Sequence, residues 1–326
     1  MRAFGKFLGR AILGLALLLA AIWFFGPREP MDTEISFDAS ALGDDLDGYL
    51  STQESRFDDI VPGTHKRIIW AGDTGVKTPL SVVYIHGWSA TSEELRPVPD
   101  MVAKALGANL YYTRLTGHGR DGEALAAATA GDWIEDAAEA MAIGRRLGER
   151  VILFGTSTGG TLVAELAASS VLNADLAGAA FVSPNFKIAD SNAPLLTLPF
   201  ARFYVPMVGG ETRSWAGTNE MHTLYWTRSY PTVAVLPLAV LVKHAATLDY
   251  AAVKTPGLFI YNMKDNVVLH ERTKEVIKEW GGPTRIMNPE VPDDEMDGVH
   301  VLAGDILSPT RTGPVAAEII NWARGL

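Results

Sequence analysis

The sequence predicts an α/β fold in which a mostly parallel sheet is covered by helices on both faces. Several apolar segments of strand length show no period-two alternation, which indicates that both faces of each strand are buried. Segments with helical spacing lie between them, as in successive strand–helix–strand units. The chain has 326 residues, of which 48% are hydrophobic. These apolar residues are sufficient for one large domain, or for a core domain with an insertion.

Charge and cysteine content exclude several classes of function. The formal net charge is −10, and residues 1–28 contain four basic and no acidic residues, so the rest of the chain is more acidic still. Such a surface argues against binding to nucleic acid and against adsorption to anionic lipid. There is no cysteine. Disulfides, thiolate nucleophiles, cysteine–zinc sites and lipid-modified cysteine anchors are therefore excluded.

Residues 1–28 are predicted to be a membrane anchor or a signal segment. Basic residues precede a nearly unbroken apolar run at 11–25, which reaches about 20 residues if the nearest basic side chains snorkel to the membrane surface. Bulky aromatic residues at 23–25 suit a membrane interface better than a cleavage site. We expect an uncleaved anchor with the catalytic domain on the extracytoplasmic side. Earlier cleavage after Ala20-Ala21, followed by export, is the alternative. The basic residues that precede the apolar run are Arg2, Lys6 and Arg10.

Residues 29–64 are predicted to link this segment to the core. An amphipathic helix is expected within residues 41–60, where apolar side chains recur on one side. They are Leu42, Leu46, Tyr49, Leu50 and Phe57.

The core is expected to comprise residues 65–183 and 251–326. A capping box at Thr91 and Glu94 predicts a helix that ends at Ala105, and Asp132 with Glu135 predicts one that ends at Leu147. Further helices are expected at 161–167, 271–280 and 315–323. Strands are expected at 65–71, 80–85, 109–115, 151–154, 177–182, 257–261 and 285–287.

Residues 184–250 interrupt this alternation. They are rich in proline, aromatic and aliphatic residues, and no strand–helix pattern is visible in them. We interpret them as an inserted helical cap whose apolar face covers a site at the carboxyl ends of the strands. Ordinary helix packing would account for many of the same residues.

Ser157 lies in a Gly-x-Ser-x-Gly motif between the predicted strand at 151–154 and the predicted helix at 161–167. This context gives the motif its meaning, because the tight turn exposes the serine at the sheet edge with helix amides beside it. Without a partner base, the motif would be only a glycine-rich turn with an incidental serine. The glycines that remove clashing side chains are Gly155, Gly159 and Gly160.

A serine nucleophile needs a base, and the base needs a carboxylate that orients it. In such a sheet the expected chain order is serine, acid, histidine. His300 is the predicted base, because it lies in a loop between the last strand and the final helix. The other histidines after the serine are His222, His244 and His270.

Asp265 is the predicted acid. It follows the strand at 257–261, near the edge of the sheet, where it can hold one imidazole nitrogen protonated. A turn cap is the alternative role for this residue. Competing acids near His300 are Asp293, Asp294 and Glu295.

Two backbone amides are predicted to stabilise an oxyanion. One belongs to Thr158, directly after the serine, and the other to Trp88, in the loop after an early strand. His86 is expected to stabilise that loop rather than to transfer protons. The segment Gly117-His118-Gly119 is expected to be a tight structural turn.

Four segments together resemble the α/β-hydrolase superfamily, and within it the carboxylesterase and monoacylglycerol-lipase-like serine hydrolases. The resemblance covers about residues 65–326 and departs at Thr158, where lipase-like members often carry a larger residue. It implies Ser157 as nucleophile, His300 as base and Asp265 as acid, with no cofactor or metal. The segments are Tyr84-Ile85-His86-Gly87-Trp88, residues 114–120 (Arg-Leu-Thr-Gly-His-Gly-Arg), residues 155–160 (Gly-Thr-Ser-Thr-Gly-Gly) and the pair Asp265 and His300.

The expected function is hydrolysis of a carboxylic ester with an aliphatic or acylglycerol-like group. The expected partners are a small-molecule or lipid-like ester and, through the N-terminal helix, a membrane, with no nucleic acid. Thioester, amide and peptide cleavage remain open, because the same three residues can perform them. A non-catalytic binding module is the alternative from another class.

Overall fold

The computed structural model describes residues 2–292 and 299–326. Its centre is a seven-stranded sheet with strand order β1-β3-β2-β4-β5-β8-β9. Only β1 runs antiparallel to its neighbour, so the predicted mostly parallel sheet is confirmed. The strands are β1 (Arg67–Ile69), β2 (Thr78–Ile85), β3 (Asn109–Tyr112), β4 (Gly148–Thr156), β5 (Leu176–Val182), β8 (Gly257–Ile260) and β9 (Thr284–Met287).

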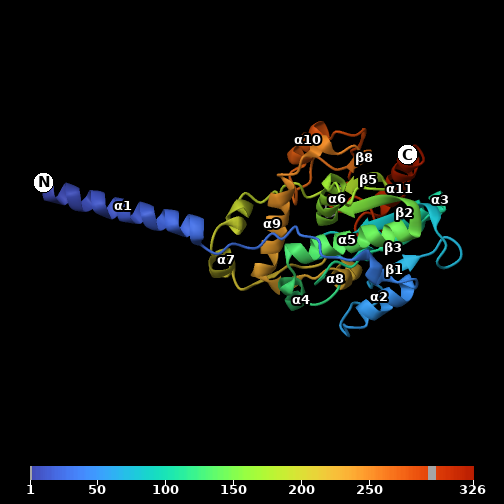
Figure 1. Ribbon diagram of the computed structural model, residues 1–326, viewed down its shortest axis with the longest axis horizontal. Helices are drawn as coiled ribbons and strands as arrows, with labels where there is room; N and C mark the ends of the chain where they lie inside the picture. Colours follow the sequence, from blue (N-terminus) through green and yellow to red (C-terminus); the bar gives the residue numbers. More distant parts are fainter. Residues whose placement is uncertain (1, 293–298) are drawn as a thin grey trace.

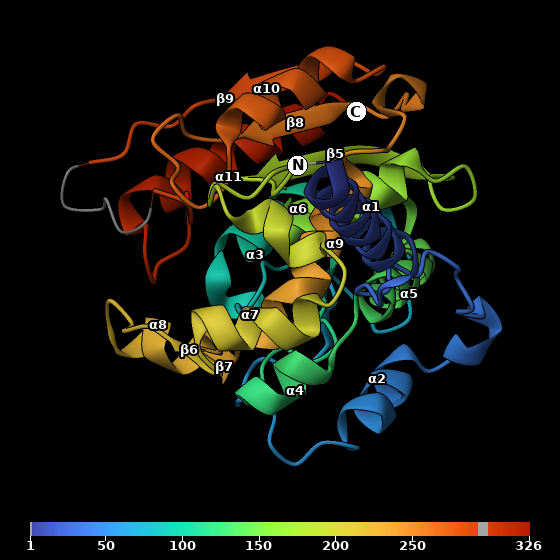
Figure 2. The same ribbon diagram turned by 90° about the vertical axis from the view of Figure 1, so that its left-hand side faces the viewer.

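Both faces of the sheet are buried, which explains the missing period-two alternation. Val83 and Leu153 point into one apolar cluster with α5 and α6, whereas their neighbours Val82 and Ile152 point into a second cluster with α3 and α11. Figures 1 and 2 show helices on each side of the sheet. The helices of the core are α3 (Val98–Leu106), α5 (Ala130–Leu147), α6 (Thr158–Ala168), α10 (His270–Glu279) and α11 (Pro309–Ala323).

Two predicted helix starts are wrong. Thr91 caps only the short 3₁₀ helix η2 (Ser92–Glu94), and α3 begins at Val98, so Glu94 is not part of a capping box. The capping box of α5 is formed by Thr129 and Asp132, three residues before the predicted pair of Asp132 and Glu135. Local sequence pairs resemble caps wherever Ser, Thr, Asp and Glu are spaced by three. Tertiary contacts decide which pair is used.

The N-terminal helix α1 (Arg2–Phe25) projects away from the rest of the molecule (Figure 1). Its stretch Lys6–Phe25 has a mean hydropathy of 2.1 and no part of it is buried. By length and composition it can cross a membrane, and a signal sequence near an N-terminus would pass the same test. The predicted helix at 41–60 is shorter than expected, with η1 (Ala39–Leu42) and α2 (Leu46–Glu54) in its place.

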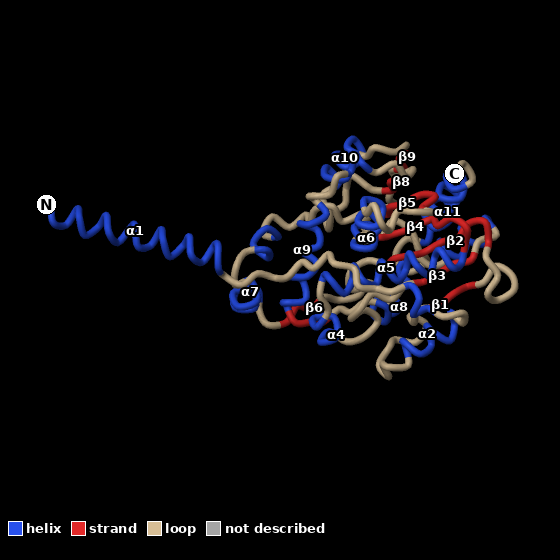
Figure 3. The backbone as a smooth tube through the Cα atoms, viewed as in Figure 1, coloured by secondary structure: helices blue, strands red, loops and turns tan. Residues whose placement is uncertain are grey.

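The segment between β5 and β8 has helices as its main regular elements, as expected (Figure 3). It also contains a small antiparallel sheet, β6 (Thr212–Ser214) with β7 (Ser229–Pro231), which the sequence did not predict. Helix α4 (Gly122–Ala127), from the core, packs against this segment. We propose that residues 184–250 act as a cap. Its other elements are η3 (Ala193–Thr197), α7 (Ala201–Gly209), α8 (Glu220–Tyr225), η4 (Thr232–Ala234) and α9 (Val235–Ala245), and η5 (Tyr250–Ala252) leads back to the core.

Candidate active site

Ser157 lies in a sharp turn between β4 and α6. Its backbone has φ 73° and ψ −107°, which is sterically unfavourable for a residue with a side chain. A Cβ atom at Gly155 would lie 2.7 Å from the Gly160 nitrogen, and one at Gly159 would lie 2.6 Å from the Ile85 carbonyl carbon. The turn therefore requires both glycines, and Gly159 allows the start of α6 to contact the end of β2.

Gly159→Ala is expected to destabilise the protein by about 3 kcal/mol or more, because the new methyl group would overlap the backbone at the end of β2. Urea denaturation measures this loss. The matched control is Gly72→Ala in an exposed bend, where a Cβ atom meets nothing within 4 Å. That change is expected to be neutral, since the new methyl group points into open solvent. Equal unfolding free energies for the two variants would contradict the prediction.

The structure brings Ser157, His300 and Asp265 together. The His300 Nε2 atom lies 3.0 Å from Ser157 Oγ, and its Nδ1 atom lies 2.8 Å from Asp265 Oδ2. The other carboxylate oxygen of Asp265 accepts hydrogen bonds from the amides of Val267 (2.8 Å) and Val268 (3.1 Å). These bonds fix the carboxylate at the end of β8. The three side chains form one hydrogen-bonded chain, although they are far apart in the sequence.

The protonation pattern of this chain follows from its partners. Because a carboxylate only accepts, His300 carries its proton on Nδ1, and Nε2 is left to accept the Ser157 hydroxyl proton. Burial alone would lower the pKa of His300, but the Asp265 charge and hydrogen bond, together with Glu94, raise it above 6.5. The imidazolium is therefore stabilised within the site.

The three other candidate histidines are engaged elsewhere. His244 lies 3.4 Å from Glu165, and His270 lies 3.1 Å from Glu271. His222 packs between the rings of Trp215 and Trp226, with centroid distances of 4.9 and 4.6 Å. The competing acids Asp293, Asp294 and Glu295 lie outside the described residues.

The loop after β2 lies beside the Ser157 turn, because α6 contacts the end of β2. Within the described part of the chain, neither the Trp88 amide nor the Thr158 amide donates a hydrogen bond to protein. The Trp88 ring packs edge-on against Tyr230 of β7, with centroids 4.9 Å apart. The segment 184–250 therefore contacts the loop that carries one of the two predicted oxyanion amides.

His86 and His118 connect the loops at the ends of β2 and β3. His86 donates from Nδ1 to the Gly87 carbonyl (2.9 Å) and accepts the Leu115 amide at Nε2 (3.1 Å). Burial lowers the pKa of His86 to about 4, so the ring is neutral. The Nδ1 atom of His118 donates to the Thr116 carbonyl (3.1 Å), and the His118 ring packs on the ring of His86. The residues on either side of His118 in the sequence are glycines with positive φ. These contacts match the structural roles expected for both residues.

Glu94 lies near the site and does not have the helix-capping role predicted for it. Its buried carboxylate accepts hydrogen bonds from the Gly87 amide (2.7 Å) and the Tyr84 hydroxyl (3.2 Å), so it holds the loop that precedes Trp88. Burial raises the pKa of Glu94 to about 7, although the Gly87 bond and His300 oppose this. Its spacing from Thr91 resembled a helix cap. The only sequence signal of another role is its position six residues after Trp88, in the loop predicted to carry an oxyanion amide.

Glu94→Gln is expected to reduce the loss of stability on going from pH 4.5 to pH 7.5. A carboxyl with a raised pKa favours the folded state below its ordinary pKa of 4.5, and this contribution is lost as pH rises through about 7. The difference corresponds to about 3 kcal/mol. Glutamine keeps an oxygen acceptor but does not ionise. Urea denaturation at both pH values tests this, with the exposed Glu149→Gln as control, and equal pH dependence in the two variants would contradict it.

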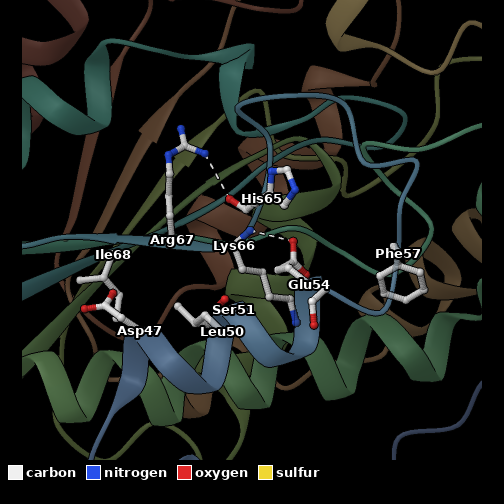
Figure 4. Close-up of a pocket in the computed structure, with 10 residues that line it drawn as sticks. Asp47, Leu50, Ser51, Glu54, Phe57, His65, Lys66, Arg67 and Ile68 are labelled. Atoms are coloured by element: carbon white, nitrogen blue, oxygen red, sulfur yellow. Dashed lines mark hydrogen bonds between the residues drawn. The ribbon is translucent and has the colours of Figure 1, made fainter.

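Two of the cavities among the described residues, both outside this cluster, exceed 400 Å³. The one in Figure 4, of about 420 Å³, lies between α2 and β1 and contains charges that are already paired. Glu54 accepts the Lys66 amide (3.0 Å) and forms a buried ion pair with Arg114 (2.7 Å). The other, of about 590 Å³, lies between η3, α9 and the start of α10. Within residues 2–292 and 299–326, no group of three or more His, Asp or Glu side chains is placed to hold a metal ion.

The fold and the serine turn define the class of protein, and comparison with known families agrees. A family model described as the alpha/beta hydrolase family matches residues 82–302. The chain belongs to this family, and the resemblance predicted from the four sequence segments is confirmed.

Among its relatives is the thermostable monoacylglycerol lipase of Bacillus sp. (strain H-257). It is 26% identical over 191 residues, which cover 58% of this chain and 72% of that protein. A structure from work on LipS and LipT, two metagenome-derived lipolytic enzymes, has a TM-score of 0.65 at 20% identity and covers 82% of this chain and 100% of that one. The monoacylglycerol lipase of Paleococcus ferrophilus has a TM-score of 0.55 at 16% identity, with coverage of 80% and 98%. At these identities the structural likeness shows a shared fold.

Proposed function

We propose that the chain is a serine hydrolase that cleaves carboxylic esters through an acyl-enzyme. The observation that carries this proposal is the hydrogen-bonded chain from Ser157 Oγ through His300 to Asp265. Each contact has the length of an ordinary hydrogen bond, and the chain runs from hydroxyl through imidazole to carboxylate, which is the order that nucleophilic catalysis requires.

The proposed reaction proceeds in two halves. Ser157 Oγ attacks the acyl carbonyl carbon while its proton moves to His300 Nε2, and the resulting imidazolium is stabilised by Asp265. The amides of Trp88 and Thr158 donate to the oxyanion. His300 then protonates the departing alcohol. In the second half His300 takes a proton from water, whose oxygen attacks the acyl carbonyl carbon. His300 then returns the proton to Ser157 Oγ as the bond to the acyl group breaks and the acid is released.

The proposed substrate is an aliphatic or acylglycerol-like ester. Two relatives are monoacylglycerol lipases by name. An apolar cluster that includes Val205, Tyr230 and Leu236 of the cap packs against Trp88, beside the proposed oxyanion amide. An acyl chain can therefore be bound by apolar side chains close to the scissile carbonyl.

The proposed location of the enzyme is a membrane surface. Helix α1 would span the bilayer with its basic end in the cytoplasm, which places the catalytic domain on the extracytoplasmic side. Export after cleavage of the N-terminal segment is the alternative. Mass spectrometry of the membrane fraction separates the two, because only the anchored form retains the peptide that contains residues 11–25.

Substrate profiling with full-length protein in detergent tests the proposed function. We expect hydrolysis of p-nitrophenyl esters and monoacylglycerols, with kcat/KM changing with acyl length, and a fluorophosphonate adduct on the Ser157 peptide. Matched thioesters and anilides in the same panel would reveal the other reactions open to these residues. A folded protein that hydrolyses none of them and takes up no probe would contradict the proposal.

A further inference from the structure

Helix α7 carries apolar side chains on its outer face as well as on its buried face. Phe203, Met207 and Val208 are 68%, 85% and 86% exposed, whereas Ala201 and Val205 are buried. A helix on the surface of a globular protein normally turns polar residues outward. A contiguous apolar patch of this kind marks a binding surface. We call Phe203, Met207 and Val208, together with the half-exposed Leu195 and Phe200, the α7 apolar face.

The end of α1 is fastened to the start of α7. The Phe200 amide donates to the Pro27 carbonyl (2.7 Å), and Arg28 donates to the Thr197 carbonyl (3.1 Å). Close packing supports these bonds, since a Cβ atom at Gly26 would lie 2.7 Å from the Phe200 ring. The α7 apolar face therefore begins, in space, beside the point where α1 ends (Figure 1).

An ion pair with a buried carboxylate strengthens this junction. The Glu29 carboxylate accepts two hydrogen bonds from Arg202, at 2.7 and 2.6 Å, and the Glu29 side chain is fully buried. A two-point bond between a guanidinium and a carboxylate fixes orientation as well as distance. The cap is thus held at a set angle to α1 rather than tethered by a free linker.

We propose that the α7 apolar face is inserted into the surface of the same lipid bilayer that α1 spans. The twenty residues Lys6–Phe25 form about 30 Å of helix, which equals the thickness of the hydrocarbon core. The aromatic residues Trp23, Phe24 and Phe25 then lie at the interface, and α7 lies at the same level. Arg28 and Arg202 border the apolar residues, where they can contact lipid phosphates.

This inference rests on the proposed anchoring by α1 and adds a route for the substrate. The cap that contacts the Trp88 loop would stand on the membrane. An acylglycerol could then pass from the bilayer to Ser157 without crossing water as a free molecule. A bilayer suits the face better than a second protein copy does, because α1 already fixes the distance and direction of the membrane relative to α7.

The absence of native cysteine allows single labels to test the proposal in the full-length chain. Met207→Cys, Phe24→Cys and Val171→Cys would each carry an environment-sensitive NBD fluorophore in phosphatidylcholine vesicles. Val171 is a matched control, because it is 75% exposed and lies beyond the far end of α6. We expect the labels at 207 and 24 to be blue-shifted and quenched by shallow doxyl lipids. Iodide quenching at 207 should be at least fivefold weaker than at 171.

Each other outcome has a defined meaning. A membrane-embedded label at 24 with a water-exposed label at 207 overturns the inference and leaves the anchor in place. Water-exposed labels at both positions overturn the anchor and the inference together. A label at 207 that is shielded from iodide but not quenched by doxyl lipid indicates a protein partner or a second copy, and also overturns it. None of these readouts depends on catalysis, so failure of the proposed ester hydrolysis would be seen separately.

Breaking the junction gives a second, independent test. Arg202→Gln removes the charged partner of Glu29 while α7 keeps its apolar face. In this background the Met207→Cys label should become at least twofold more accessible to iodide, while the Phe24→Cys label stays in the membrane. An unchanged label at 207 would show that the junction does not hold the face in the bilayer, and would overturn that part of the inference.

Discussion

Ser157→Ala is expected to lower kcat for ester hydrolysis by about 10⁵- to 10⁶-fold and to abolish labelling by a fluorophosphonate. Ser157 Oγ lies 3.0 Å from His300 Nε2 and is the atom proposed to bond to the acyl group. Without this hydroxyl, no acyl-enzyme can form. Initial rates with a p-nitrophenyl ester and mass spectrometry of the probe-treated protein measure both effects.

Ser183→Ala is the matched control for this prediction. Ser183 is also a buried serine at the end of a neighbouring strand, and its hydroxyl has no hydrogen-bond partner among the described residues. We expect the control to keep probe labelling and most of its activity. Persistent labelling in Ser157→Ala would show that another residue is the nucleophile.

The strands and the triad candidates could be predicted because each depends on short-range features. A buried parallel strand is an apolar run of four to eight residues, and it appears as such at residues 80–85 and 257–261. The residue that follows such a run lies at the carboxyl edge of the sheet. Together with the Gly-x-Ser-x-Gly motif and the expected chain order of serine, acid and histidine, this rule led to Ser157 and Asp265, which the structure places with His300 in one hydrogen-bonded chain.

The parts that were not predicted depend on contacts between distant segments. Glu94 was assigned to a helix cap because Thr91 precedes it by three residues, whereas its carboxylate is buried beneath the Gly87 amide. The small β6–β7 sheet has strands of three residues, which are too short for any alternation to be recognised. The junction between Glu29 and Arg202 joins residues 173 positions apart, which no local pattern could indicate.

Asp265→Asn is expected to lower kcat/KM by about 10⁴-fold. It is also expected to move the acidic limb of the pH–rate profile to lower pH. Activity requires neutral His300, so it falls as pH drops through the pKa of this residue. Burial alone would lower that pKa, and the Asp265 carboxylate contributes most to raising it above 6.5. Without the carboxylate charge, burial dominates and the pKa falls below 6.5. The asparagine amide can also donate to Nδ1, which favours the tautomer that cannot accept the serine proton.

A pH–rate profile between pH 4.5 and 8.5 separates this role from a structural one. A variant that was merely destabilised would lose activity without a shift of the limb, because the fraction that remains folded would titrate as before. The exposed Asp190→Asn change, on the cap-side loop, removes the same charge away from His300 and should leave both the rate and the limb unchanged. If the limb stays above pH 6.5 in Asp265→Asn, the carboxylate does not set the pKa of the base. Another acid would then have to orient His300.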